Sequence, residues 1–103
     1  MTNPFPEPQT VDIKINQEIS SWMDSQLKST GKILFYDCMD AFEQTLETKD
    51  INRAKIIAYY ITKSLLKSTM PVDKRDEIII MFTEGINSLK ENRESFLIKT
   101  NHK

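Results

Sequence analysis

The 103-residue chain carries 28% charged and 39% hydrophobic residues, which is the composition of one globular domain and argues against a disordered segment. Two glycines are too few to supply the turns of a β-rich fold, so the composition favours helices. A net charge of −1 argues against a protein that binds nucleic acid with its whole surface. No apolar run reaches the roughly 18 residues of a membrane helix, and a secretory signal is not recognisable, so we expect a cytoplasmic protein.

Prolines at positions 4, 6 and 8 forbid a helix at the start of the chain and favour an extended arm. We expect residues 1–15 to form this Pro-rich N-terminal arm, outside the core. Its Asn3-Pro4-Phe5 tripeptide resembles the short ligand with which eukaryotic trafficking proteins dock on EH-type modules. The alternative is a leader whose Phe5 packs locally. Residues 10–15 alternate between apolar and polar side chains, so both strand and helix are open there.

A first helix is expected over residues 16–29, at the start of a single helical domain that spans residues 16–99 and precedes a frayed tail at 100–103. Apolar residues recur at helical spacing: Ile15, Ile19, Trp22, Met23 and Leu27. Asn16 is the expected N-cap, and Gly31 is the expected left-handed residue that ends the helix.

A second helix is expected over residues 32–48. Its apolar face consists of Phe35, Cys38, Met39, Phe42 and Leu46. Its opposite face is acidic and consists of Asp37, Asp40, Glu43 and Glu47. Ile33, Leu34 and Tyr36 lie beside the apolar stripe. Cys38 is the one cysteine, so it cannot form an internal disulfide, and we interpret it as a small apolar filler.

A third helix follows, capped by Thr48 or Asp50, and ends before Pro71. Its core stripe consists of Ala54, Ile57, Ala58, Ile61 and Leu65. Four further apolar residues occupy its other sides: Ile56, Tyr59, Tyr60 and Leu66. A helix that is apolar nearly all round is either central in a bundle or covered on a second side by a partner.

A fourth helix is expected to start at Asp73 as N-cap, with Asp76 and Glu77 favoured at the positive end of the helix dipole. Its apolar face consists of Ile78, Ile79, Phe82, Ile86, Leu89, Phe96 and Leu97. Gly85 interrupts this face, which indicates that another helix crosses closely there or that the helix kinks. Ile80 projects from the charged side. The pattern as a whole predicts an all-α, four-helix bundle-like domain.

Charge is unevenly distributed between the second and third helices. Residues 31–50 contain five acids and two lysines, a balance of −3, whereas residues 51–75 contain six bases and one acid, a balance of +5. Because the connection is short, we expect the two helices to be antiparallel neighbours. Their charges could then pair within the monomer or across the two-fold axis of a homodimer.

Catalytic and metal-binding chemistry has few candidate residues here. His102, the one histidine, lies in the polar tail, so a Ser–His or Cys–His site is not expected. His102 and Cys38 alone cannot make a structural zinc site. Gly31 and Gly85 stand apart, so no glycine-rich phosphate loop exists. We therefore predict that the chain contains no catalytic, cofactor-binding or metal-binding residue and that the protein is not an enzyme.

The apolar surplus predicts a small non-enzymatic protein–protein interaction module, that is, an adaptor, chaperone-like partner or regulator that works as a homodimer or with another protein. The predicted contact residues are Ile56, Tyr59, Tyr60, Lys63, Lys67 and Ile80. The alternative is a small nucleic-acid-binding regulator that contacts phosphates through the basic face of the third helix, with Arg53, Lys55, Lys63 and Lys67.

Overall fold

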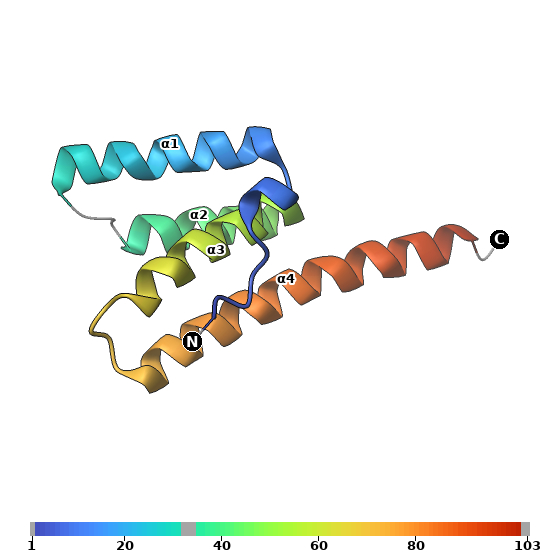
Figure 1. Cartoon of the computed structure of the whole chain (residues 1–103). Coiled ribbons are helices and arrows are strands. Elements are labelled where there is room, and N and C mark those ends of the chain that lie inside the picture. Colours follow the sequence, from blue (N-terminus) through green and yellow to red (C-terminus); the bar gives the residue numbers. More distant parts are fainter. Residues whose placement is uncertain (1, 32–34, 102–103) are drawn as a thin grey trace.

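Four α-helices and one 3-10 turn make up the computed structural model, which describes residues 2–31 and 35–101, without the side chains of Gln9 and of residues 92–101 (Figure 1). The elements are η1 (Pro8–Thr10), α1 (Ile13–Thr30), α2 (Phe35–Glu47), α3 (Ile51–Leu66) and α4 (Val72–Asn101). This part of the chain contains no strand, so the all-α prediction is confirmed. The predictions for Ile33, Leu34, Phe96, Leu97 and His102 lie outside the residues or side chains described.

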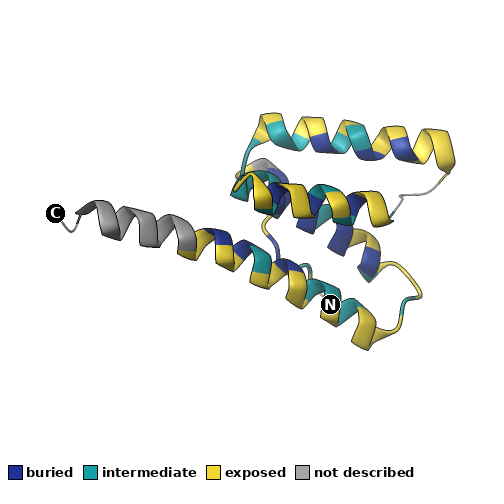
Figure 2. Ribbon diagram, turned by 180° about the vertical axis from the view of Figure 1, so that it is seen from behind, coloured by how far each residue is buried: buried dark blue, intermediate teal, exposed yellow. Residues whose placement is uncertain are grey.

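The helix α3 is the centre of the fold. It contacts α1, α2, α4 and η1, and α1 and α4 lie on opposite sides of the antiparallel α2–α3 pair (Figure 1). Seven of its sixteen residues are buried. Figure 2 shows that buried residues gather where the helices face one another, while exposed residues cover the outer faces. The apolar character on all sides of α3 is therefore explained by its central position.

The start of α1 differs from the prediction. Asp12, not Asn16, is the N-cap, because its Oδ1 accepts a hydrogen bond from the Ile15 backbone N–H at 3.1 Å. The η1 turn brings the chain into this position, since the Asp12 N–H donates to the Pro8 carbonyl. Residues 13–15 are consequently helical, and the alternation of apolar and polar residues there does not form a strand. The end of α1 is as predicted, with Gly31 at φ 78° and its N–H donating to the Leu27 carbonyl.

Local capping was predicted correctly for α3 and incorrectly for α4. The Asp50 Oδ1 accepts from the Arg53 N–H at 3.1 Å, which confirms Asp50 as the cap of α3. The helix α4 begins at Val72, so Asp73 lies inside its first turn and is not the N-cap. The reason is that the Pro71 carbonyl already accepts the Arg75 N–H at 3.0 Å and so begins the helical hydrogen-bond ladder one residue earlier.

The N-terminal segment, residues 2–12, is part of the fold and not a free arm. It crosses α3 from α4 to the start of α1 (Figure 1). The Asn3 Nδ2 donates to the Tyr59 carbonyl at 3.0 Å, and the Asn3 Oδ1 accepts from the Phe5 N–H. Phe5 is only 9% exposed and packs edge-to-face on Phe82, with ring centroids 6.2 Å apart. The prediction that the N-terminal arm lies outside the core was therefore wrong. Burial of the aromatic ring stabilises the fold by more than the conformational entropy that is lost when a short proline-stiffened segment becomes ordered.

Gly85 marks the close crossing of α2 and α4 that its position predicted. A Cβ atom at this residue would lie 3.2 Å from ring carbons of Phe42 and 3.3 Å from Leu46 Cδ2. The Phe42 ring also packs on Phe82, with centroids 4.7 Å apart. Any larger residue here would be tight, because its Cβ would have to displace the buried Phe42 ring or the Leu46 side chain by a few tenths of an ångström.

Candidate interaction surface

Reactive groups are scarce in the described part of the chain. No three histidine, cysteine, aspartate or glutamate side chains lie close enough there to hold a metal ion together. Cys38 is completely buried, and this burial together with the charge of Asp37 raises the pKa of its thiol to about 11. It fills the core as a small apolar residue, as predicted. Among the described helices, none combines the length and apolar character needed to cross a membrane.

The six predicted contact residues do not form one surface. Ile56 is 0% exposed, so its prediction as a contact residue was wrong: it lies across α3 from Ala54, on a side that the fold also covers. Tyr59 and Tyr60 are half-buried, with their rings edge-to-face at 5.5 Å. Ile80 is 55% exposed but belongs to α4, away from the lysines of α3. The N-terminal segment and α1 take much of the place that an external partner was predicted to occupy.

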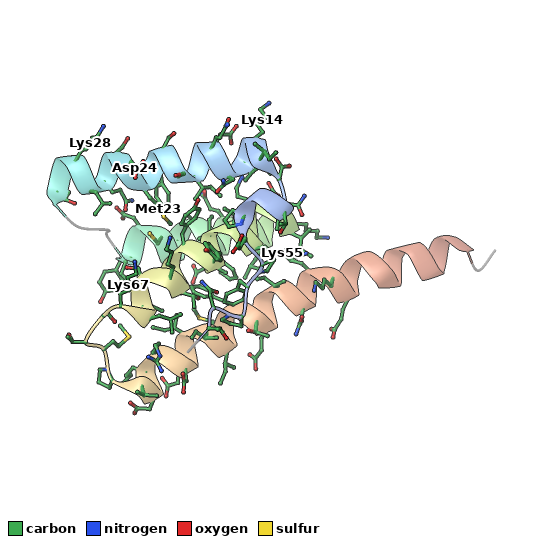
Figure 3. All side chains as sticks on the ribbon, in the orientation of Figure 1. Lys14, Met23, Asp24, Lys28, Lys55 and Lys67 are labelled. Atoms are coloured by element: carbon green, nitrogen blue, oxygen red, sulfur yellow. The ribbon has the colours of Figure 1, made fainter. Side chains whose placement is uncertain are left out.

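Three of the six residues do come together, in a groove between α1 and α3 with a volume of about 310 Å³. We call it the α1–α3 groove; its lining residues are Ser20, Met23, Asp24, Leu27, Tyr60, Lys63, Ser64 and Lys67. Figure 3 shows Met23 on the side of α1 that faces α3, and Lys67 near the end of α3. Met23 is buried, Leu27 is 43% exposed and both lysines are exposed. The groove therefore has an apolar floor and an edge that is basic on balance, with Lys63 and Lys67 and one exposed carboxylate, Asp24.

Tyr60 ties this groove to the helix α1. Its hydroxyl donates a hydrogen bond to the Asn16 Oδ1 at 2.5 Å, so the ring is held in one orientation above the groove.

The sequence pattern placed Met23 and Leu27 in the core stripe of the first helix, and no local signal separates a core leucine from a groove leucine. Only the packing of α1 on α3 shows that Leu27 lies at the open end of this stripe.

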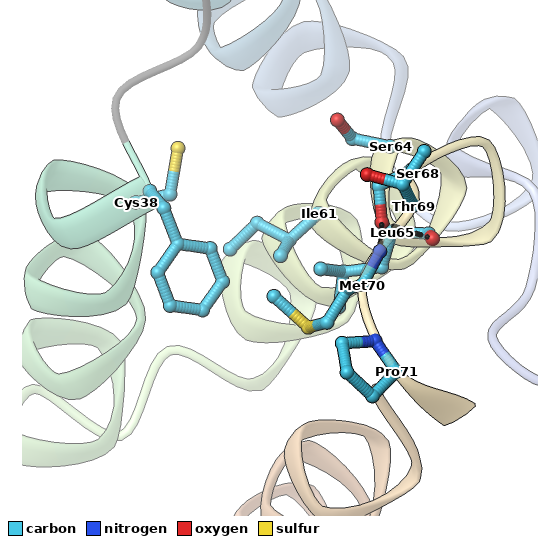
Figure 4. A pocket seen from close by; sticks show the side chains of 9 residues that line it. Cys38, Ile61, Ser64, Leu65, Ser68, Thr69, Met70 and Pro71 are labelled. Carbon is cyan, nitrogen blue, oxygen red and sulfur yellow. Dashed lines mark hydrogen bonds between the residues drawn. The ribbon is translucent and has the colours of Figure 1, made fainter. Parts of the chain in front are cut away.

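A second, larger hollow of about 570 Å³ lies at the other side of the end of α3 (Figure 4). Its lining residues are Phe35, Cys38, Ile61, Ser64, Leu65, Ser68, Thr69, Met70 and Pro71. Figure 4 shows Ile61 and Met70 between Cys38 on one side and the three hydroxyl residues on the other. No charged residue lines it within the described chain, so its polar lining consists of the hydroxyls of Ser64, Ser68 and Thr69 and offers no charge to a ligand. Three separate elements form this hollow, which is why no sequence pattern predicted it.

The four bases of the nucleic-acid hypothesis are divided between different sides of α3. Arg53 donates to Glu18 at 2.9 Å and to Asp50 at 3.3 Å, and the hydrogen bond with Glu18 raises the pKa of its guanidinium. Lys55 lies on the side of α3 that meets the N-terminal segment and α4. Lys63 and Lys67 belong to the α1–α3 groove. The positive charge of α3 is thus not one continuous face that could follow a phosphate backbone.

The acidic face of α2 is exposed. Four of its exposed residues follow one line along the helix, which we call the α2 acidic stripe: Tyr36, Asp40, Glu43 and Glu47. Tyr36 is 83% exposed. The ion pairs found among the described residues are Arg53–Glu18, Arg53–Asp50 and Arg75–Asp76, and none involves α2. The predicted pairing of α2 acids with α3 bases within the monomer is therefore not made in this part of the chain.

Comparison with protein-family models, with curated proteins and with solved structures finds nothing that matches this chain. Function is consequently inferred from two features of the described surface. One is the α1–α3 groove with its apolar floor and basic edge. The other is the α2 acidic stripe, whose carboxylates have no cationic partner among the described residues.

Proposed function

We propose that this chain is a small, non-enzymatic protein–protein interaction module that binds its partner in the α1–α3 groove. The observation that carries the proposal is that Tyr60, Lys63 and Lys67 line one groove with Met23 and Leu27. Aromatic and methionine side chains supply contact area at interfaces, and lysines at the edge steer an oppositely charged partner into place. The partner should therefore present carboxylates beside one or two large apolar or aromatic side chains.

A second copy of the chain has this chemistry in its α2 acidic stripe. The stripe offers three carboxylates and the exposed ring of Tyr36, and none of these carboxylates has an ion-pair partner among the described residues. Lys63 and Lys67 likewise form no ion pair among the described residues, and the one carboxylate that lines their groove, Asp24, leaves it a net positive charge. Complementary charges that are left unused within one molecule favour their use between two molecules. We therefore propose self-association as the activity of the module.

The positions of the two surfaces determine how copies would associate. Lys63 and Lys67 lie on roughly the opposite side of α3 from Leu65, which lies with Cys38 of α2 in the same hollow. In Figure 1, α2 lies behind α3, and in Figure 2, seen from behind, it lies in front. The groove and the stripe therefore face away from each other. One copy would offer its stripe to the groove of the next, head to tail, which leaves one groove and one stripe free at the two ends.

The test is light scattering on a size-exclusion column over a wide range of protein concentration. We expect the mass of the wild type to rise with concentration. Lys63→Glu/Lys67→Glu reverses the groove and Glu43→Lys/Glu47→Lys reverses the stripe, and each variant alone should stay monomeric because like charges then meet. An equimolar mixture should associate again, because the unaltered stripe of the first variant matches the unaltered groove of the second.

The matched control is Lys14→Glu/Lys74→Glu, which makes the same change in net charge at two exposed lysines outside the groove and should associate like the wild type. A wild type that remains monomeric at every concentration would reject the proposal. If both charge-reversed variants associated as strongly as the wild type, the groove and the stripe would be rejected as the contact surfaces. The ratio of absorbance at nucleic-acid and protein wavelengths, read from the same column, detects co-eluting nucleic acid and so tests the alternative function.

A further inference from the structure

A second group of positive charges lies away from the groove, where the N-terminal segment crosses α3 and α4. Lys55 of α3 and Lys90 of α4 line the same hollow, which has a volume of about 180 Å³. Thr83 and Asn87 contribute polar atoms from α4, and Pro4, Phe5, Pro6 and Ile86 complete the wall. Figure 3 shows Lys55 beside the N-terminal segment and close to α4. The hollow thus joins three parts of the chain that are far apart in sequence.

The electrostatics of this hollow are unfavourable as it stands. Burial lowers the pKa of the half-buried Lys55, and the like charge of Lys90 lowers it further. No carboxylate lines the hollow within the described chain, and neither lysine belongs to an ion pair there. Folding has therefore placed the half-buried Lys55 beside the exposed Lys90 with no counter-charge in the lining of the hollow. Such local conflicts are expected where a chain keeps residues for binding and not for stability.

The remaining polar groups define what kind of ligand would relieve this repulsion. The Thr83 hydroxyl already donates to the Ile79 carbonyl at 2.8 Å, so it can only accept a further hydrogen bond. The Asn87 amide can donate. The proline residues offer no N–H, and the Phe5 N–H is bound to Asn3. The donors are thus two ammonium groups and one amide, which match an anion with two charges and several oxygen atoms.

We propose that this hollow binds a phosphate group, held by Lys55 from α3 and by Lys90 and Asn87 from α4. A doubly charged phosphate neutralises both lysines at once, whereas a single carboxylate leaves one positive charge unmatched. The group can come from inorganic phosphate or from a small phosphate monoester. The proposal is independent of self-association, because it uses no residue of the α1–α3 groove or of the α2 acidic stripe.

The test is a titration of the ¹⁵N-labelled full chain with sodium phosphate, followed by amide chemical shifts, against sodium chloride at the same ionic strength. Phosphate should shift the amides around Lys55 and from Thr83 to Lys90, and should raise the Tm above its value in chloride. Lys55→Met and Lys90→Met should each weaken phosphate binding by about tenfold, the effect of losing one charge-assisted hydrogen bond. Glycerol phosphate in a parallel titration distinguishes a monoester from the free ion by which of the two binds more tightly.

Lys14→Met/Lys74→Met is the matched control, because it removes two exposed lysines that do not line this hollow, and its phosphate binding should equal that of the wild type. Lys55→Met removes a partly desolvated cation, so its Tm in chloride should not fall below that of the wild type, and loss of binding cannot then be ascribed to unfolding. Identical shifts in chloride and phosphate would overturn the proposal. So would wild-type affinity in both Lys55→Met and Lys90→Met.

Discussion

Two sides of α3 show the same mixture of apolar and basic residues but have different surroundings. One side, with Lys55 and Tyr59, is covered by the chain's own N-terminal segment, whose Phe5 is only 9% exposed. The other side, with Tyr60, Lys63 and Lys67, borders a groove that stays open. Apolar residues on several sides of a helix therefore indicate buried contacts, but they do not indicate whether the chain's own segments or a partner make those contacts. The difference can be tested by asking which side contributes to the free energy of unfolding.

The largest effect is expected on the covered side, from Phe5→Ala. The change removes a nearly buried ring that packs on Phe82 and should lower the free energy of unfolding by about 2–4 kcal/mol, toward the lower part of the range for buried phenylalanines because the site is near the chain end. Urea-induced unfolding measures it. Phe5→Leu keeps most of the volume and should lose much less. A loss within error for Phe5→Ala would show that the N-terminal segment contributes nothing to stability.

A gain in stability is expected from Thr62→Val, again on the covered part of α3. Thr62 is 0% exposed, and its hydroxyl has no hydrogen-bond partner in the part of the chain that the structure describes. Replacing an unsatisfied buried hydroxyl by a methyl group should raise the free energy of unfolding by about 1–2 kcal/mol. Thr45→Val is the control: Thr45 is also buried, but its hydroxyl donates to the Phe42 carbonyl, so this variant should lose stability. Changes of the same sign in both would contradict the assignment.

Tyr60→Phe tests the boundary between the covered and the open side. It removes the hydrogen bond to the Asn16 side chain and should cost about 0.5–1.5 kcal/mol. A double-mutant cycle with Asn16→Ala isolates this pair, and the coupling energy should account for most of the loss. Tyr59→Phe should have almost no effect, because the Tyr59 hydroxyl has no partner among the described residues and only its backbone carbonyl is used. Equal losses in the two tyrosine variants would argue against a specific Tyr60–Asn16 bond.

The smallest effect on stability is expected on the open side. Lys63→Gln/Lys67→Gln removes two exposed charges without ion-pair partners in the described chain and should change the free energy of unfolding by less than about 0.5 kcal/mol. Arg53→Gln breaks two ion pairs and should cost somewhat more, up to about 1 kcal/mol. Thermal and urea unfolding of the three proteins give the comparison. A clear destabilisation by the lysine variant would mean that the open side is structural.

Features that depend on a few neighbouring residues were predictable, with limits. Gly31 and Asp50 were placed correctly because a left-handed residue and a side-chain cap act within one turn of the helix. Asn16 and Asp73 were misplaced because another nearby group had already satisfied the first backbone donors: Asp12 for α1 and the Pro71 carbonyl for α4. Several acceptors compete at a helix start, and the path of the preceding chain decides between them.

Sequence alone determined that this protein is helical, which face of each helix is apolar and that α2 carries an acidic face, because these follow from residue spacing along a helix. At Gly85 it left a close crossing and a kink open. Tertiary structure decided the rest. It placed Phe5 in the core, buried Ile56, and brought Lys55 beside Lys90. The physical reason is that helical periodicity is local, whereas the cover of an apolar face or the neighbour of a charge comes from residues tens of positions away.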